Sequence, residues 1–543
     1  MSAIHRRNRP PLSFWIKAGA AALLVALADL LFFGREPGGS LGVFALAWTL
    51  ATVAVHPAIR RDRRALLAAG IAACFAGLQI ESPNPLGWLL FMAALGVAAL
   101  SCRAGPADDA WRWLQRLAYQ AIVGLFGGLI DSLKLLKRRK VRSRPRRLLA
   151  LLPLLTLPVV GGAVFLGLFA AANPVIADIL AQLRLPRIDA GRVIFWGVIL
   201  VVTWATLRPR FQRKPLALPT KTDDSLPIGV SVASVTLSLL VFNVLFALQN
   251  GLDIAFLWSG APLPDGVTLA EYAHRGAYPL IATALLAGLF VLVALRPGTA
   301  TAKAPLIRWL VVLWVLQNLF LVASSILRTV DYIEVFSLTR FRIAALLWMA
   351  LVGLGLVLIC WRMLRAKSAS WLINANAFAA LIVLAGISVV DLGAVAAAWN
   401  VRHAREVGGR GSALDLCYLN RLGPSAAVSL VELEQQSLSP ELRDRVAWVR
   451  GQATDDLRRD QDDWRGWTWR AQRRLDRIAA LTAGRPAAPP PTAGDRDHCD
   501  GQLKPPAVEV APLPPPAVSA PAPLPEPSTP QTPSAPLTST SEP

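Results

Sequence analysis

The chain has 543 residues, of which 54% are hydrophobic and 17% are charged, and its mean hydropathy is +0.46. A soluble domain carries about 25% charged residues, so this composition excludes a soluble enzyme, a coiled coil and a disulfide scaffold. The net charge of +21 comes mostly from Lys and Arg between apolar blocks, where they orient membrane helices rather than bind nucleic acid. We therefore expect an all-α polytopic integral membrane protein whose main partner is the lipid bilayer.

Eleven apolar blocks have the length of membrane-spanning helices, about 15 to 25 residues. They are residues 12–33, 41–55, 65–80, 86–101, 148–172, 191–207, 227–250, 276–295, 306–328, 341–362 and 374–399. The second, third and fourth blocks are short enough to pair as re-entrant hairpins. The expected count is therefore about eleven, within a range of about nine to thirteen.

The charges of the loops are consistent with one orientation of these spans. If the N-terminus is cytoplasmic, the loops at 56–64, 102–147 and 208–226 are cytoplasmic, and these loops are rich in Lys and Arg. The intervening loops at 34–40 and 81–85 hold only Arg35 and no basic residue, respectively. Since basic loops stay in the cytoplasm, the pattern predicts a cytoplasmic N-terminus and a C-terminal region on the outer side.

Segment 111–136 does not fit the span pattern. Its uninterrupted apolar core is too short to cross a bilayer, and basic residues flank both of its ends. We expect an amphipathic helix on the cytoplasmic leaflet, with Trp111 and Trp113 at the interface. A twelfth, weakly hydrophobic span is the alternative.

Changes of composition divide the chain into five regions. We expect a four-helix membrane region at 1–105, a cytoplasmic amphipathic and basic segment at 106–147, and a seven-helix membrane domain at 148–400. Polar, Arg-rich sequence with helical spacing predicts a small extramembrane domain at 401–483. Residues 484–543 contain 18 of the 41 prolines and predict a disordered tail. This tail is either a dispensable solvated end or a link to an envelope protein or cell-wall partner.

The cysteines do not reveal a disulfide framework or a metal site. The chain has five of them, and none forms a CxxC pair. Whether Cys417 and Cys499 pair stays open at this point.

Polar side chains gather toward the outer ends of the seventh to eleventh spans. Polar groups inside a bilayer are costly, so they indicate either a site or interhelical pairs. The candidate pocket residues are Asn243, Gln249, Asn250, Asp253, Glu271, His274, Arg275, Gln317, Asn318, Arg328, Tyr332, Glu334, Arg340 and Asp391.

Two interpretations of these polar residues remain open. In the first, Arg275, Arg328 and Arg340 bind a phosphate or carboxylate in an outward-facing pocket. In the second, these arginines pair with acidic residues such as Glu271 and Glu334 and hold the loops together.

The chain contains no motif of a known catalytic centre. Walker, GxSxG and dinucleotide motifs are absent from the sequence, and Glu271 with His274 and His403 lacks the spacing of a zinc site. We therefore assign no catalytic residue, metal or cofactor.

Four blocks of sequence carry a resemblance to a known family. They are NVLFALQNGLDIAFLW with LAEYAHRGAYPLIATALL, VFSLTRFRIAALLWMALVGLGL, LDLCYLNRLGPSAAVSL, and DWRGWTWRAQRRL. In this order they resemble the bacterial membrane proteins of domain of unknown function 4173, which are related to family 4153, over about residues 225–475. The resemblance implies a bacterial inner-membrane location and the architecture of many spans followed by a polar C-terminal region. It implies no catalytic residue.

Three functions follow as hypotheses. The first is a ligand-binding, sensing or envelope-assembly protein with an outward-facing polar pocket. The second is a secondary transporter of a small anionic solute, which needs polar groups at mid-depth, such as Asn243 and Gln317. The third is a membrane enzyme acting on a lipid-linked substrate, which needs an acid or base such as Glu271, His274 or Asp331.

Overall fold

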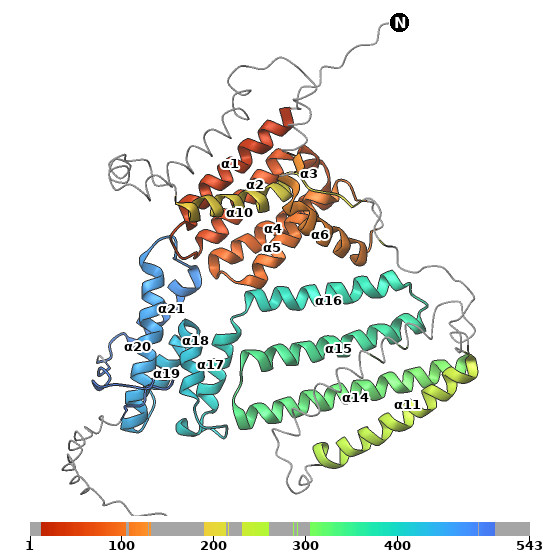
Figure 1. Cartoon of the computed structure of the whole chain (residues 1–543). Helices are drawn as coiled ribbons and strands as arrows, with labels where there is room; N and C mark the ends of the chain where they lie inside the picture. Colours follow the sequence, from red (N-terminus) through yellow and green to blue (C-terminus); the bar gives the residue numbers. More distant parts are fainter. Residues whose placement is uncertain are drawn as a thin grey trace, which may run out of the picture.

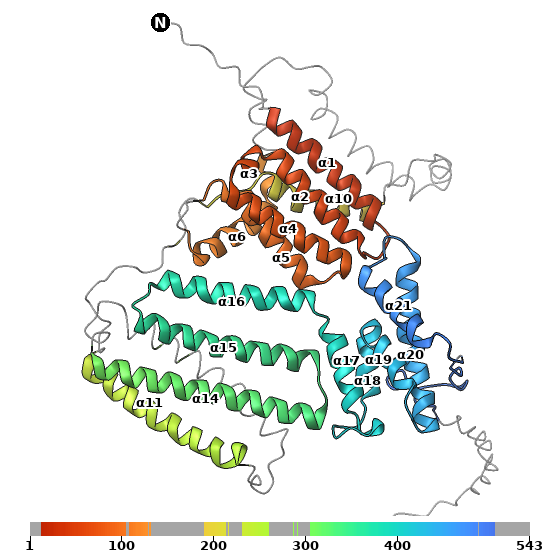
Figure 2. The same ribbon diagram turned by 180° about the vertical axis from the view of Figure 1, so that it is seen from behind.

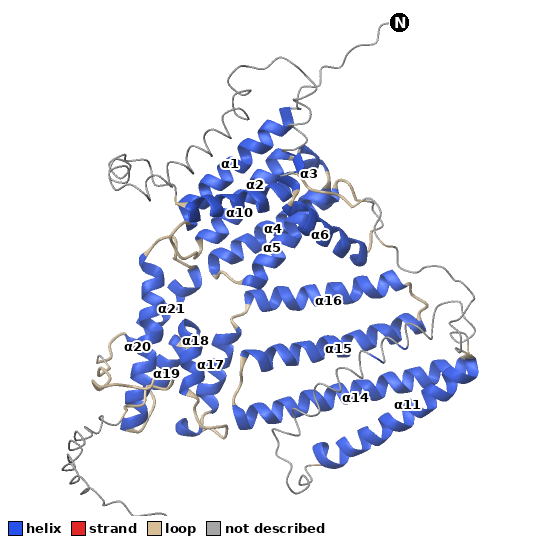
Figure 3. Ribbon diagram, in the orientation of Figure 1, coloured by secondary structure: helices blue, strands red, loops and turns tan. Residues whose placement is uncertain are grey.

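The computed structural model describes residues 12–104, 108–128, 130–131, 189–212, 216, 231–259, 286, 290, 304–486 and 488–504. Over these residues the chain forms helices and connecting loops, without a β-strand (Figure 3). The all-α prediction is confirmed for this part of the chain.

Seven helices are long and apolar enough to cross a bilayer. They are α1 (Leu12–Phe32), α4 (Arg63–Glu81), α10 (Ala190–Leu207), α11 (Val232–Asp253, continued by the π-helix η1, Ile254–Trp258), α14 (Pro305–Phe336), α15 (Arg340–Leu364) and α16 (Ala369–Val389). Two more apolar helices, α2 (Ser40–Val55) and α5 (Pro85–Ser101), are shorter. The chain is thus a multi-span membrane protein. The count of eleven stays a prediction, because the blocks at 148–172 and, apart from residues 286 and 290, 276–295 lie outside the described residues.

Helices α1, α2, α4, α5 and α10 pack into an N-terminal bundle (Figures 1 and 2). Aromatic rings fill its core, where Phe44, Trp48 and Phe91 are almost fully buried. Trp48 donates its indole N–H to the hydroxyl of Thr206 at 2.7 Å, so the one polar atom of this ring is satisfied. Helix α3 (Pro57–Arg61) turns the chain between α2 and α4.

Helices α11, α14, α15 and α16 lie side by side in one row (Figures 1 and 2). Gly353 of α15 faces α14, where an added Cβ would lie in ordinary van der Waals contact with Val322 and Leu319. Few side chains of α15 and α16 are buried, and large apolar side chains such as Trp348 and Phe378 are exposed on them. Exposed apolar side chains of this kind suit helices that face lipid.

Helix α6 (Ala110–Leu125) has its polar side chains inside and its apolar side chains outside. Arg116 and Gln120 are buried against α10, whereas Leu114 and Ile122 are 59% and 63% exposed. Helix α6 covers the first part of the predicted amphipathic segment 111–136 and ends at Leu125. It is not among the helices apolar enough to span a bilayer.

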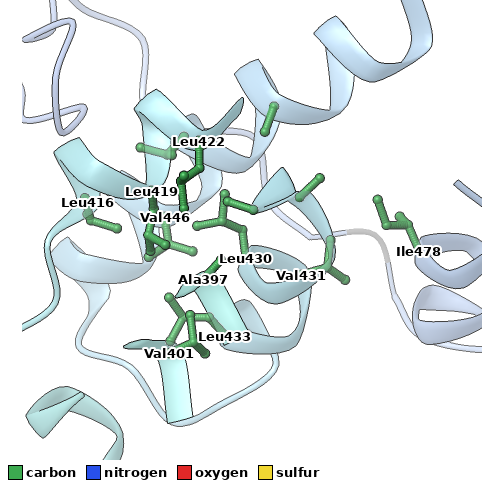
Figure 4. Packing of buried hydrophobic residues seen from close by; sticks show 14 of the residues in the cluster. Ala397, Val401, Leu416, Leu419, Leu422, Leu430, Val431, Leu433, Val446 and Ile478 are labelled. Carbon is green, nitrogen blue, oxygen red and sulfur yellow. The ribbon is translucent and has the colours of Figure 1, made fainter. Parts of the chain in front are cut away.

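A C-terminal domain follows the row of spans. Its helices are α17 (Leu392–His403), α18 (Leu416–Leu422), α19 (Ala427–Glu434), α20 (Pro440–Asp462) and α21 (Trp469–Thr482), with 3₁₀ turns at Arg405–Val407 (η2) and Gly423–Ser425 (η3). Figure 4 shows their shared core, in which Leu419, Leu430 and Val446 are at most 1% exposed. A smaller cluster of Ile333, Leu338 and Ala396 packs the start of this domain against the ends of α14 and α15.

The boundaries of this domain differ from the prediction at both ends. The predicted span 374–399 is two helices, because Asp391 accepts hydrogen bonds from the backbone of Gly393 and Ala394 and thereby starts α17. At the other end, residues 488–504 lie against the domain, beyond the predicted boundary at 483. They are held by the disulfide between Cys417 and Cys499, which answers the open question about these cysteines.

The two ends of the membrane helices differ in what they meet. The C-terminal domain contacts the end of α1, the end of α4 and the end of α16. We call this side the domain face. The opposite side, the basic face, carries the α2–α4 connection with Arg60, Arg61 and Arg64, and the ends of α5 and α10 with Arg103 and Arg208.

Candidate functional site

A pocket of about 570 Å³ lies at the domain face, where the C-terminal domain meets the loops of the N-terminal bundle. The α1–α2 loop, residues 34–38, and Pro83 of the α4–α5 loop form one wall. The C-terminal domain forms the other wall with parts of α20 and α21 and the turn between them. We call this cavity the interface pocket. Its volume is in the range of small-ligand sites.

The two walls of the interface pocket are joined by backbone hydrogen bonds. The N–H of Gly38 donates to the carbonyl of Arg465 at 3.1 Å, and the N–H of Gly39 donates to that of Trp467 at 2.8 Å. These bonds need glycine, because a Cβ on Gly38 would overlap the carbonyl group of Gly466. The C-terminal domain is therefore seated directly on the first membrane hairpin.

The pocket is lined by charges of both signs. Three cationic side chains, those of Arg35, Arg459 and Arg474, face three acidic ones, those of Glu36, Asp460 and Asp463. Arg35 Nη1 pairs with Asp463 Oδ2 at 2.9 Å across the two walls. The lining is thus neutral by formal charge but strongly polar.

Burial and neighbouring charges shift three of the pocket groups. The pKa of Asp460 is raised by burial and by the nearby carboxylate of Glu36. The pKa of Asp463 is lowered by a hydrogen bond from the backbone of Arg465 and by Arg35. The pKa of Arg474 is lowered by burial, although Asp391 opposes this effect. Perturbed groups inside a cleft are typical of binding sites.

A second polar region follows the contact between α11 and α14. Gln317 Nε2 donates to Asn243 Oδ1 at 2.8 Å, Asn243 Nδ2 donates to the carbonyl of Leu310 at 3.1 Å, and Asn250 Nδ2 donates to the carbonyl of Gln317 at 3.3 Å. Helix α14 advances about 1.5 Å per residue, which places Gln317 about 18 Å from its start. Since α14 has 32 residues, Gln317 lies inside this long apolar helix and away from both of its ends.

An ion pair closes this polar region toward the domain face. Asp253 Oδ1 accepts from Arg328 Nη2 and, at 3.0 Å, from Gln249 Nε2. Asp253 is 0% exposed and Arg328 is 7% exposed. The π-helix η1 begins at the next residue, Ile254, and its Trp258 donates to Ser324 Oγ at 3.1 Å. We call the polar side chains of α11 and α14 in this region the polar seam; they are Asn243, Gln249, Asn250, Asp253, Gln317 and Arg328.

Other predicted site residues lie outside the polar seam. Asn318 is buried and donates to the carbonyl of Trp314 in its own helix at 2.7 Å. The ring of Tyr332 lies under the guanidinium of Arg342, 4.4 Å away, and Glu334 is exposed on α14. The backbone N–H of Arg340 donates to the hydroxyl of Tyr418 at 2.9 Å.

The predicted residues therefore do not all come together. Asp391 forms an ion pair with Arg474, which lines the interface pocket, but Asp391 is not itself a lining residue. The polar seam is formed by Asn243, Gln249, Asn250, Asp253, Gln317 and Arg328. Glu271, His274 and Arg275 lie outside the described residues, so the pocket predicted from them stays a prediction. Sequence reasoning missed Arg35, Asp460 and Asp463. The WRGWTWR motif, which directly follows Asp463 in the chain, was the sequence signal that could have indicated this region.

The sequence model described as "Domain of unknown function (DUF4153)" matches residues 65–433, more than half of the chain. The chain belongs to the DUF4153 family. The more specific resemblance to family 4173 is not shown. No curated protein and no solved structure matches the chain.

The DUF4153 match changes the extent of the family region. It begins at residue 65, so it includes N-terminal spans that the resemblance over 225–475 left out. It ends at residue 433, before the α20–α21 turn that lines the interface pocket. Within the described residues of this DUF4153 protein, no group of His, Cys, Asp and Glu has the geometry of a metal site.

Proposed function

We propose that this protein is a ligand-binding or sensing component of the bacterial cell envelope. It spans the inner membrane, and its C-terminal domain covers a pocket on the periplasmic side. The observation that carries the proposal is the interface pocket, because its two walls come from the first membrane hairpin and from the C-terminal domain. A ligand bound there changes the contact between the two parts.

Two features support the periplasmic placement of the domain face. Arginines gather at the basic face, which the positive-inside rule assigns to the cytoplasm. The domain on the other side holds the disulfide Cys417–Cys499, and disulfides persist in the periplasm but rarely in the cytosol. The Pro-rich tail beyond Lys504, which lies outside the described residues, would then be able to reach an envelope or cell-wall partner.

The mixed charges suggest the kind of ligand. Three cationic and three acidic side chains suit a small zwitterion or a hydroxyl-rich molecule better than a simple anion. Glu36 is exposed and hence available to such a ligand, and Arg459 is exposed although it also pairs with Asp456 at 3.1 Å.

The orientation is tested by cysteine labelling in a variant that lacks the free cysteines Cys74, Cys102 and Cys360. In intact spheroplasts, a membrane-impermeant maleimide is expected to label Glu36→Cys but to label Arg61→Cys only after permeabilisation. Both positions are exposed. Labelling of Arg61→Cys alone in intact spheroplasts would reverse the orientation and contradict the proposal.

The binding role is tested by complementation of a deletion strain, with sensitivity to detergent as the envelope phenotype. The double variant Glu36→Gln/Asp460→Asn removes two pocket charges, and Glu441→Gln removes an exposed charge of α20 that does not line the pocket. We expect normal amounts of folded protein from both, with loss of complementation only in the pocket variant. Full complementation by the pocket variant would exclude a binding role for the interface pocket.

A second candidate function is transport of a small anionic solute, and the polar seam is the observation that favours it. Ionisable and amide side chains at mid-depth often mark a solute or proton path, and π-turns often accompany functional sites. Counterflow of labelled phosphate and acetate into vesicles that contain wild type or Gln317→Leu tests this alternative. Equal counterflow of labelled phosphate and acetate in protein-containing and empty vesicles would argue against it.

A further inference from the structure

A second pocket, of about 580 Å³, lies at the basic face. It is lined by Lys17 near the start of α1, Arg103 after α5, and Arg208, Pro209, Arg210 and Phe211 after α10. Because α1 and α10 run antiparallel, their opposite ends bring Lys17 and Arg208 together. We call this cavity the basic pocket. It is separated from the interface pocket by the length of the spans.

The charges of the basic pocket are only partly compensated. Asp131 is 4% exposed and pairs with Arg210 at 2.8 Å and with Arg208 at 3.4 Å. Arg103 donates to the carbonyl of Pro209 at 3.2 Å, which leaves its positive charge in place. Among the described residues, two of the four cationic side chains of this pocket thus pair with a carboxylate, that of Asp131. Such an excess of positive charge attracts an anion.

The nearby His56 leaves the excess of positive charge in the basic pocket unchanged. His56 is half-buried, and its Nε2 lies 3.0 Å from the carbonyl of Leu207. Its pKa is lowered to about 4, first by burial and then by the positive charge of Lys17 and Arg103. His56 is therefore neutral at pH 7 and adds no charge to the pocket.

The pocket is also next to the expected lipid surface. The span of α1 begins at Phe14, and Trp15 and Ile16 beside Lys17 are 57% and 53% exposed. A tryptophan at the end of a span usually lies at the level of the lipid headgroups. The ring of Phe14 lies 5.5 Å from the guanidinium of Arg208, which places apolar and cationic groups side by side. This combination suits a ligand with a phosphate at one end and hydrocarbon at the other.

We propose that the basic pocket binds a phosphate group, supplied by the headgroup of an anionic phospholipid of the inner leaflet. Lys17 and Arg103 contact the phosphate, Arg208 and Arg210 remain fixed by Asp131, and the acyl chains lie along Trp15 and Ile16. Basic pockets between membrane helices on the cytoplasmic side are suited to such headgroups. The inference is independent of the ligand site proposed at the domain face, whereas the assignment to the inner leaflet rests on the orientation given in the proposed function.

The test uses the purified full-length protein in nanodiscs of phosphatidylcholine with increasing phosphatidylglycerol. Retained lipid is counted by native mass spectrometry after extraction into detergent. Wild type is expected to retain phosphatidylglycerol in preference to phosphatidylcholine. In Lys17→Gln and Arg103→Gln the preference falls about fivefold for each removed charge. Lys17→Arg keeps the charge and the preference, and it also shows that substitution at this position is compatible with folding.

A matched control is Arg60→Gln/Arg61→Gln, which removes two exposed charges from the same face. Equal loss of phosphatidylglycerol in this control and in Lys17→Gln/Arg103→Gln would overturn the proposal, because it would show attraction by general surface charge. Inorganic phosphate and glycerol phosphate distinguish the source. The lipid assignment requires that neither displaces phosphatidylglycerol at equal concentration, and displacement by either would overturn it.

Discussion

Asp253 of α11 and Arg328 of α14 form an ion pair between two neighbouring membrane helices, and Asp253 is fully buried. Asp253 also accepts a hydrogen bond from Gln249, yet its Oδ2 accepts none from the described residues. A charge so far from water is tolerated only because it has a partner. The pair thus connects the stability of the row of spans to the polar seam.

We expect Arg328→Met to destabilise the membrane domain by about 3–5 kcal/mol, because the buried carboxylate of Asp253 loses its cation. The double variant Asp253→Asn/Arg328→Met removes both charges and is expected to recover most of this loss. The measurement is the thermal midpoint of detergent-solubilised protein by fluorescence-detected gel filtration. The exposed Lys367→Met is the control. If the double variant were as unstable as Arg328→Met, the ion pair would not be the cause.

The sequence predicted that Arg328 has either an anionic ligand or an acidic partner, but it did not identify Asp253. The acidic partners considered were Glu271 and Glu334, whereas Asp253, itself a candidate pocket residue, lies 75 residues from Arg328 in the chain. The packing of the whole row decides which faces of α11 and α14 contact each other. The positions of apolar blocks in the sequence do not predict these contacts. The spans themselves were predictable, since α10, α14 and α15 each begin within two residues of the expected start.

The interface pocket could not be predicted for a similar reason. Its walls come from residues 34–38 and from the region around Asp463, more than 400 residues later, and no local pattern links them. The end of α16 was more accessible to prediction. Asp391 followed by Gly393 is typical of the start of a new helix, and both residues lie within the predicted span 374–399.

Gly38→Ala is expected to loosen the C-terminal domain from the first membrane hairpin. The added methyl group overlaps the Gly466 carbonyl, and backbone atoms must shift to relieve this contact. The expected cost is about 1–3 kcal/mol. Hydrogen exchange of peptides covering residues 34–43 should become faster, while exchange in α19 stays unchanged. Gly70→Ala in α4 is the control, because a Cβ there meets nothing within 4 Å. Unchanged exchange at 34–43 would show that the two parts are not held together by this contact.

Cys417→Ser is expected to destabilise the C-terminal domain by about 4 kcal/mol, since the disulfide closes a long segment of chain. The two cysteines are separated by 82 residues, so reduction frees most of the domain sequence. Thermal unfolding with and without a reductant should differ for wild type but not for the variant. The exposed, unpaired Cys74 provides the control variant Cys74→Ser. A wild type that is insensitive to reductant would contradict a stabilising role for this bond.

The neutral state of His56 makes stability depend on pH in a definite direction. Its pKa is about 4 in the folded protein, mainly because of burial, and about 6.5 when the chain is unfolded. Between these values the unfolded state binds more protons than the folded state, so stability is complete above pH 6.5 and falls as the pH drops toward 4. His56→Gln removes this titration. The difference in thermal midpoint between wild type and His56→Gln should therefore be constant from pH 7.5 to about 6.5 and should move against wild type from there down to about pH 4. A constant difference over the whole range would mean that His56 binds its proton equally in both states, and would contradict the burial of its imidazole in the folded protein.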